Sequence, residues 1–255
     1  MPPETVAQRA GEAGEAEALA RLRARLDDLG WYHTQELAPG LVTPGMFDLR
    51  PFVGRYGLPD DLSGMRALDV GTFEGFWAFE LERRGAAEVL AADLPDPEAL
   101  DWPASLREQH VKSLDERKED RFGYAHEALG SRVERVERSV YELGPDLGRF
   151  DLVFCGDLLV HLKDPVTALE RIRGVCAGRA IIANPIKRFR FRERRALAEL
   201  EGIDEFTWWV TNLAGLVRMT RAAGFRRVEA LEPFELPFRE GGGWKGLRGV
   251  VHAHV

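Results

Sequence analysis

The feature that most constrains the fold is an apolar run at residues 66–70 that passes directly into a turn containing Gly71 and Gly75. A helical pattern follows over 75–85, and a second apolar run at 88–92 ends in Asp93. A strand, a glycine turn, a helix and a second strand ending in a carboxylate are typical of a nucleotide site at the C-terminal edge of a parallel sheet. The same pattern is also compatible with a strand–turn–helix unit that binds no ligand.

The turn does not suit a dinucleotide. A pyrophosphate needs glycine at the first, third and sixth positions of the loop, which are Gly71, Phe73 and Phe76 in this chain. Glu74 is expected to add negative charge where the phosphates would lie. An adenosyl sulfonium with a zwitterionic tail carries no such penalty. We therefore expect S-adenosylmethionine, with Asp93 accepting hydrogen bonds from both ribose hydroxyls.

The bulk properties indicate one globular domain with additions. The chain has 255 residues and a formal net charge of −7, which argues against a globally basic surface for nucleic acid. Cys155 and Cys176 are isolated in apolar context, which is typical of a reducing compartment. The first residues do not resemble a signal peptide, and no apolar run approaches the length of a membrane span. We expect a cytoplasmic protein that needs no metal and binds no membrane.

Apolar strands alternate with helical patterns, which predicts a parallel sheet covered on both faces. The expected strands are 66–70, 88–92, 133–140, 150–155, 180–183, 225–231 and 249–254. The expected helices are 12–29, 75–85, one from Asp164 and Pro165, and one from Asn212 to Gly224. The predicted class is α/β, a Rossmann-like, doubly wound, seven-stranded sheet that is mostly parallel with an antiparallel last strand, plus an N-terminal helical cap. Residues 1–60 would form the cap, with its helix and aromatic loop, and 61–255 the core, with insertions at 94–130 and 186–208.

Several motifs in register carry a resemblance to a known family. Residues 68–71 (LDVG), Asp93, Ser139, Val140 and 150–154 (FDLVF) resemble those of class I S-adenosylmethionine-dependent methyltransferases. The resemblance covers about residues 60–185 and implies that fold, that cofactor and a methyl transfer reaction.

Two further stretches are similar to one branch of this family. Residues 31–34 (WYHT) with 43–45 (TPG), and 158–165 (LLVHLKDP), resemble the branch of tRNA wobble-uridine methyltransferase-like proteins of the carboxymethoxyuridine and 5-methoxyuridine type. Those enzymes carry Tyr and Arg side chains after the fourth strand to hold an extra carboxylate on their cofactor. This chain has Val160, Leu162 and Lys163 there, which favours ordinary S-adenosylmethionine.

The resemblance and the strand order together indicate the site residues. The candidate cofactor-binding residues are Asp69, Gly71, Thr72, Phe73, Gly75, Asp93, Ser139, Val140 and Gly156. The candidate catalytic residues are His161, His33 and Asp157. Histidine titrates near neutral pH, so either histidine could serve as a base if the acceptor must lose a proton. Each could equally be a packed or capping residue, and Asp69 could support the turn instead of touching the cofactor.

The sequence therefore predicts methyl transfer to a small organic acceptor at oxygen or nitrogen. One alternative is an RNA methyltransferase that uses the basic residues of the second insertion, Lys187, Arg188, Arg190, Arg192, Arg194 and Arg195. Another alternative is a protein that binds S-adenosylmethionine without catalysis. Neither the acceptor nor the oligomeric state follows from the sequence.

Overall fold

The computed structural model describes residue 26 and residues 30–94, 96–108, 121–190, 194–202, 206–238 and 245–255. The expected helix at 12–29, apart from Leu26, lies outside these residues. The sequence also has a charge-dense helical pattern near 114–121, within the expected insertion at 94–130, and apart from Arg121 it too lies outside the described residues.

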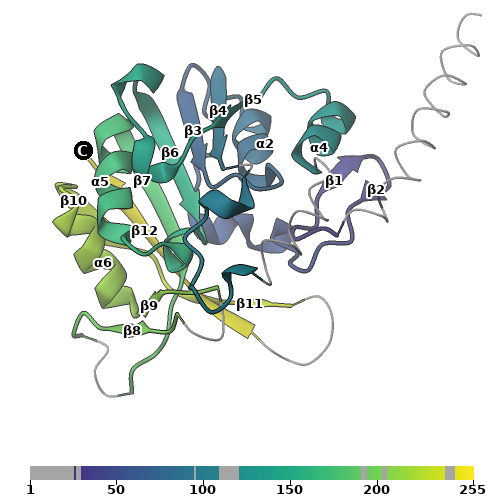
Figure 1. The fold of residues 1–255 in the computed structure, drawn as a ribbon. Coiled ribbons are helices and arrows are strands. Elements are labelled where there is room, and N and C mark those ends of the chain that lie inside the picture. Colours follow the sequence, from purple (N-terminus) through teal and green to yellow (C-terminus); the bar gives the residue numbers. More distant parts are fainter. Residues whose placement is uncertain are drawn as a thin grey trace, which may run out of the picture.

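A single mixed sheet forms the centre of the molecule (Figure 1). Its main strands are β3 (Arg66–Val70), β4 (Glu88–Asp93), β5 (Glu134–Glu137), β6 (Phe150–Gly156), β7 (Cys176–Pro185), β10 (Arg227–Ala230) and β12 (Lys245–His254). They lie in the order β5-β4-β3-β6-β7-β12-β10. The first five are parallel, and β12 is antiparallel to both of its neighbours. The predicted α/β class, with a mostly parallel sheet and an antiparallel last strand, is confirmed. The sheet has eight strands instead of the expected seven, because one further strand pairs with β12.

The strand order reverses direction beside β3. From β3 the chain moves outward to β4 and β5, and then returns to place β6 on the other side of β3. In open α/β sheets, ligands bind in the crevice that such a reversal leaves at the C-terminal ends of the strands. The ends of β3 and β6 therefore mark the position of the expected site.

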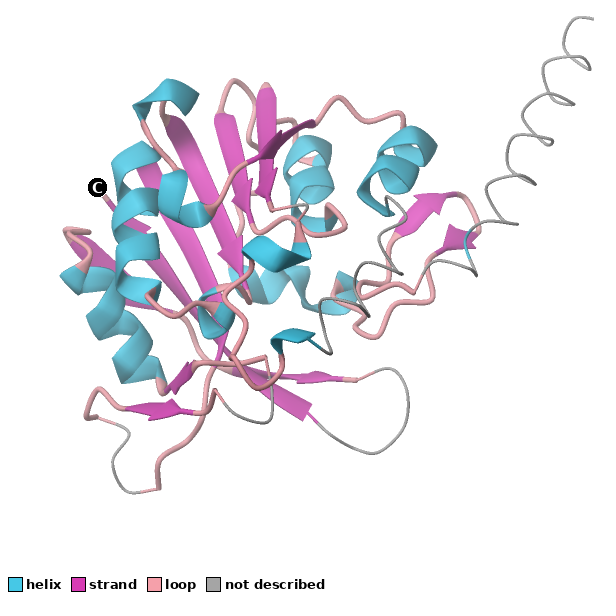
Figure 2. Cartoon of the chain, viewed as in Figure 1, coloured by secondary structure: helices cyan, strands magenta, loops and turns pink. Residues whose placement is uncertain are grey.

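Helices cover both faces of the sheet (Figures 1 and 2). On one face lie α2 (Phe76–Arg83) and α4 (Arg121–Leu129), and on the other lie α5 (Pro165–Val175) and α6 (Leu213–Ala222). Successive residues along each strand point to opposite faces of the sheet, so that Ala67 packs with α2 and Leu68 packs with α5. Both faces are buried, which explains why the strands read as continuous apolar runs.

Two helices begin at the caps that the sequence predicts. The Asp164 carboxylate accepts a hydrogen bond from the Thr167 amide at 3.0 Å, and Pro165 fills the first helical position of α5. The Asn212 side chain accepts from the Gly215 amide at 2.8 Å at the start of α6. Within the described segments, every helix is too short or too polar to cross a bilayer.

Some boundaries differ from those expected. The strand expected over 133–140 ends at Glu137, because the Ser139 hydroxyl accepts a hydrogen bond from the Tyr141 amide and starts a 3₁₀ turn, η3 (Val140–Glu142). The strand expected over 180–183 is longer, and the segment expected as an insertion at 94–130 contains α4, which packs on the sheet.

The remaining elements are short. An unexpected strand, β11 (Phe234–Pro237), pairs with the first half of β12. The two minor hairpins are β1 (Glu36–Ala38) with β2 (Leu41–Val42), and β8 (Ala198–Leu200) with β9 (Trp209–Thr211). The other 3₁₀ turns are η1 (Arg50–Tyr56), η2 (Pro97–Ala99), η4 (Pro145–Leu147) and η5 (Leu159–His161).

Candidate cofactor and acceptor site

A cavity of about 660 Å³ opens at the C-terminal ends of β3, β4 and β6. Most of the residues singled out in the sequence line it, although they come from five separate segments. Those lining residues are His33, Gly71, Thr72, Phe73, Asp93, Ser139, Val140, Gly156, Asp157 and His161. Asp69 and Gly75 do not line the cavity.

The loop after β3 turns tightly because three of its residues have a left-handed backbone. Gly71, Phe73 and Gly75 have φ values of +75°, +50° and +88°. A Cβ atom on Gly75 would lie 2.4 Å from the Phe79 ring, so that position requires glycine for space as well as for conformation. Phe73 adopts an unfavourable backbone angle for its residue type, and such strain is concentrated at functional sites.

Asp69 supports this loop through hydrogen bonds. Its carboxylate accepts hydrogen bonds from the Thr72 hydroxyl at 2.7 Å and from the Ala78 amide at 3.1 Å. Complete burial raises the pKa of Asp69 to about 7, and the nearby Asp93 charge adds to the shift. Of the two roles considered from the sequence, the geometry matches support of the loop.

Asp93 joins the loop to the end of β4. Its carboxylate accepts hydrogen bonds from the amides of Phe73 and Leu94, the latter at 2.7 Å. Because Asp93 also lines the cavity, it lies where a carboxylate could accept from the hydroxyls of a ribose.

Glu74 points away from the cavity. Its carboxylate is fully buried and accepts from the backbone amides of Tyr32 at 2.6 Å and His33 at 2.9 Å, with the Arg121 guanidinium 3.6 Å away. The expectation that Glu74 places negative charge at the ligand is therefore wrong. The residue fastens the N-terminal aromatic segment to the loop. Phe73 and Phe76, which stand where a dinucleotide loop needs glycine, still disfavour a dinucleotide.

The Phe73 ring replaces the usual middle glycine and lies on the cavity wall. It is 40% exposed, meets the Tyr32 ring edge-on at 5.8 Å, and lies 4.7 Å from the Arg121 guanidinium carbon. The ring therefore extends the wall toward the N-terminal segment.

Asp157, directly after β6, belongs to a buried ion pair. Arg248 of β12 is only 3% exposed, and its Nε donates to Asp157 Oδ2 at 2.8 Å. Within the described residues, Asp157 Oδ1 and Arg248 Nη1 have no hydrogen-bond partner. Asp157 has a left-handed backbone with φ of +52°, a second strained position at the rim of the cavity.

Two tyrosines stand beside this pair. Tyr32 and Tyr56 both line the cavity, and burial, with a further contribution from the Asp157 charge, raises the pKa of each well above its usual range. Both hydroxyls therefore keep their protons and can donate hydrogen bonds. The ion pair is neutral overall, so this end of the cavity offers polar groups without a net charge.

His161 lies on η5 at the same end of the cavity. Its Nδ1 contacts the Phe206 carbonyl oxygen, and its ring stacks on the Phe206 ring at 4.8 Å. A carbonyl oxygen only accepts, so Nδ1 carries the hydrogen and Nε2 the lone pair. Burial lowers the pKa of His161, so the ring is neutral near pH 7 and can act as a base.

His33 is held in place through its backbone. Its amide donates to Glu74, and its Nδ1 lies 3.4 Å from the same carboxylate. The ring lies 5.4 Å from that of Phe76. His33 therefore lines the cavity from the N-terminal segment, on a different element from His161.

The two expected insertions meet above the cavity. The rings of Trp102 and Phe206 stack at 3.8 Å, and Trp208 Nε1 donates to the Asp101 carbonyl. The Asp101 carboxylate also accepts from the Tyr141 hydroxyl at 2.7 Å, next to Ser139 and Val140. Trp102, Phe206 and Arg248 were not recognised in the sequence, because nothing near them signals a site and only the fold brings them together.

A comparison with protein families identifies the domain. A model described as a methyltransferase domain matches residues 45–230. The chain belongs to the methyltransferase domain family. The enzyme class expected from the sequence, an S-adenosylmethionine-dependent methyltransferase, is thereby confirmed at the level of the family.

Curated relatives of this methyltransferase match it only in part. A tRNA U34 carboxymethyltransferase of Campylobacter hominis is 29% identical over 126 residues, which are 49% of this chain and 34% of the relative. A magnesium-protoporphyrin O-methyltransferase of Rhodobacter capsulatus is 34% identical over 100 residues, which are 36% of this chain and 40% of the relative. The chain thus matches little more than a third of the length of these relatives.

One solved structure resembles most of this chain. The N-terminal domain of EvdMO1, with S-adenosylhomocysteine (SAH) bound, has a TM-score of 0.58 and 17% identity, covering 94% of this chain and 97% of that domain. At this identity the likeness establishes the fold. Among the described residues, no group of three or more His, Cys, Asp or Glu side chains could hold a metal ion.

Proposed function

We propose that this chain transfers the methyl group of S-adenosylmethionine to a small organic acceptor, at oxygen or nitrogen. The observation that carries the proposal is the cavity itself, which joins the strained loop and Asp93 to a separate polar end made by Asp157, Tyr32, Tyr56 and His161. One end suits a nucleoside and the other suits the acceptor.

The cofactor would lie across the ends of β3 and β4. Asp93 would accept from the ribose hydroxyls, and Ser139 and Val140 would border the adenine. Gly71 and Gly156 allow close approach of the backbone toward the amino-acid end. When bound, S-adenosylmethionine supplies a methyl group already activated by the sulfonium, so the protein mainly has to align the acceptor and exclude water.

His161 would remove the acceptor proton. The acceptor oxygen or nitrogen forms a bond to the methyl carbon as the carbon–sulfur bond breaks, with its electron pair left on sulfur. Nε2 of His161 takes the proton that the acceptor loses. Tyr32, Tyr56 and Asp157 would orient the acceptor. Because Arg248 balances the charge of Asp157, this group favours a hydroxyl or carbonyl on the acceptor over a carboxylate. His33 would border the acceptor from the N-terminal segment.

The N-terminal segment would act as a cap, as the division at residue 60 implies. Support comes from Glu74, which ties Tyr32 and His33 to the cofactor loop. Cys155 and Cys176 are both free and buried, which supports a reducing, cytoplasmic location.

A small acceptor is favoured over RNA for two reasons. The matching O-methyltransferase of Rhodobacter capsulatus is named for a small molecule, magnesium-protoporphyrin. The chain also has a net charge of −7, which disfavours binding of a polyanion such as tRNA. The finer assignment to the wobble-uridine branch remains a prediction.

The test is a transfer assay with tritiated S-adenosylmethionine. The purified protein is incubated with pools of phenols, hydroxy acids and amines, and in parallel with bulk tRNA. We expect label in a small product and none in tRNA, and loss of transfer in Asp93→Ala. Label found only in tRNA would contradict the proposal.

A further inference from the structure

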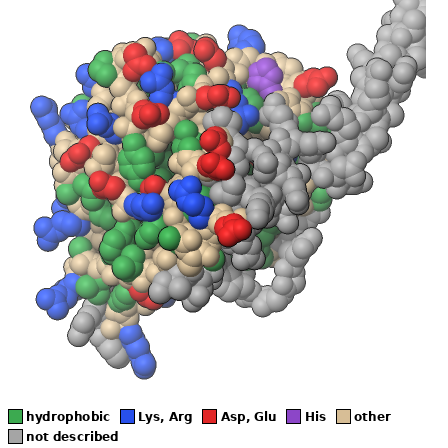
Figure 3. Space-filling view, viewed as in Figure 1, with side chains coloured by type: hydrophobic (Ala, Val, Ile, Leu, Met, Phe, Trp, Pro, Cys, Tyr) green, Lys and Arg blue, Asp and Glu red, His purple; other side chains and the backbone are tan. Residues whose placement is uncertain are grey.

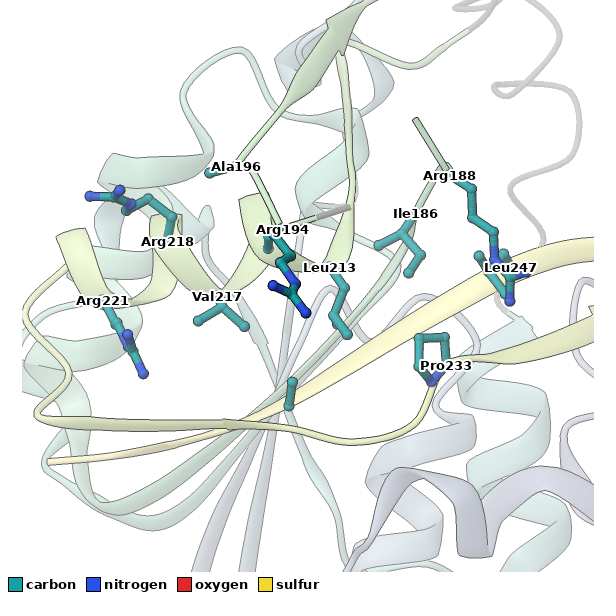
Figure 4. A pocket seen from close by; sticks show the side chains of 12 residues that line it. Ile186, Arg188, Arg194, Ala196, Leu213, Val217, Arg218, Arg221, Pro233 and Leu247 are labelled. Carbon is teal, nitrogen blue, oxygen red and sulfur yellow. The ribbon is translucent and has the colours of Figure 1, made fainter. Parts of the chain in front are cut away.

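A second concavity, of about 450 Å³, lies beside α6 and the start of β12 (Figure 4). Four arginines line it, and we call it the arginine pocket: Arg188, Arg194, Arg218 and Arg221. Between them lie the aliphatic side chains of Ile186, Leu213, Val217, Pro233 and Leu247. The lining comes from four separate segments of the chain, at 186–196, 213–221, 230–233 and 247, so the fold and not one local run of sequence creates it.

The positive charge of the arginine pocket is not compensated within the described residues. None of its four arginines forms an ion pair there, and no acidic side chain lines it. Elsewhere, arginines commonly have carboxylate partners, as Arg66 has Glu88 at 2.6 Å. Figure 3 shows basic and acidic side chains interspersed over the visible face. Neighbouring Lys187 is balanced by Glu199 and Glu201.

The floor of the arginine pocket is aliphatic. Leu213, Val217 and Leu247 are each only partly buried, and Arg188 and Arg194 lie along this floor in Figure 4. Among the residues that the structure describes, no aromatic side chain lines the pocket. Single-stranded nucleic acid binds by stacking its bases on aromatic rings, so this lining does not suit it. A net charge of −7 would also repel a polyanion at long range.

The arginine pocket is separate from the acceptor end of the cofactor cavity. Successive residues of a strand point to opposite faces, and β12 places Leu247 in the arginine pocket and Arg248 against Asp157. The two sites therefore lie back to back across one strand.

We propose that the arginine pocket binds a monomeric amphipathic anion, an aliphatic chain that carries a phosphate or carboxylate head. The guanidinium groups would form charge-assisted hydrogen bonds with the head. The aliphatic floor would bury the chain. A simple anion would use only the arginines, and a purely aliphatic ligand would use only the floor. A ligand with an anionic head and an aliphatic chain would contact both.

The test is calorimetric titration of the full chain with decyl phosphate below its micelle concentration. Inorganic phosphate and decanol serve as the head alone and the chain alone. We expect saturable binding of decyl phosphate that is about tenfold or more tighter than binding of either fragment. Arg194→Glu and Arg218→Glu should each weaken it about tenfold. The matched control is Arg171→Glu, an exposed arginine on α5 outside the pocket, which should leave the affinity unchanged.

Three results would overturn the proposal. One is equal affinity in Arg194→Glu, Arg218→Glu and Arg171→Glu, which would place decyl phosphate elsewhere. Another is binding to phosphatidylglycerol vesicles without binding of the monomer, which would indicate a membrane surface. The third is binding of tRNA, lost in the same variants, without saturable binding of decyl phosphate.

Discussion

Glu74 offers a sharp test of how the N-terminal segment is attached to the cofactor loop. Its buried carboxylate accepts from the amides of Tyr32 and His33, which lie 42 and 41 positions away in the sequence. Glu74→Gln keeps the size of the side chain but turns one acceptor oxygen into an NH₂ donor. That donor would face a backbone N–H, and Arg121 would lose a nearby negative charge.

The cost of Glu74→Gln follows from these contacts. A buried donor left without an acceptor costs about 1–3 kcal/mol, and weakening the buried pair with Arg121 adds to it. We expect the free energy of unfolding to fall by about 2–4 kcal/mol, measured by equilibrium urea denaturation followed by circular dichroism. Since a typical domain is stable by about 5–15 kcal/mol, the change in midpoint would be large.

Glu88→Gln is the matched control. Glu88 also accepts two hydrogen bonds, both from Arg66, but its side chain is 44% exposed. Solvent screens such a pair, so the control should lose at most about 1 kcal/mol. If both variants lost the same stability, the inference that Glu74 fastens the N-terminal segment would be wrong.

Three further predictions concern the loop and its neighbours. Gly75→Ala should destabilise the protein by more than about 2 kcal/mol, because the new methyl group would meet the Phe79 ring. Gly174→Ala in α5, where the space is open, should stabilise the protein by about 0.5–1 kcal/mol. Urea denaturation measures both changes, and equal effects would contradict the geometry. The raised pKa of Asp69 means that the folded chain holds a proton that the unfolded chain releases, so stability should fall as pH rises from about 4 to about 7. Asp69→Asn should remove that fall in pH-dependent denaturation, and an unchanged slope would assign it to other groups. His161→Gln should lower kcat by about 10²–10⁴-fold, and the wild-type rate should decline on the acid side with an apparent pKa below 6.5; a rate independent of His161 would exclude it as the base.

The sequence predicts the sheet well because its physical signals are local. Strands buried on both faces read as apolar runs, as at 66–70 and 88–92, and the caps Asp164 and Asn212 use side chains a few residues from their targets. The ends of strands are harder to predict from the sequence. Ser139, for example, continues the pattern of a strand but caps a 3₁₀ turn in the structure.

The candidate site is only partly visible in the sequence. The site residues on the turn after β3 and at the end of β4 can be recognised in the sequence, because they belong to the motif itself. Arg248 and Phe206 depend on which strands and insertions become neighbours, and they carry no motif. Glu74 shows a different limit: its position in the loop was clear, but the direction of its side chain depends on amides about 40 residues away.

The most direct test of this account is calorimetric titration of the full chain with SAH. We expect saturable binding at a single site. Asp93→Ala should weaken that binding about tenfold or more, and Asp96→Ala, a nearby exposed carboxylate, should not change it. Absence of binding to the wild-type chain, or equal affinity in both variants, would contradict the claim that the loop after β3 and Asp93 together hold the cofactor.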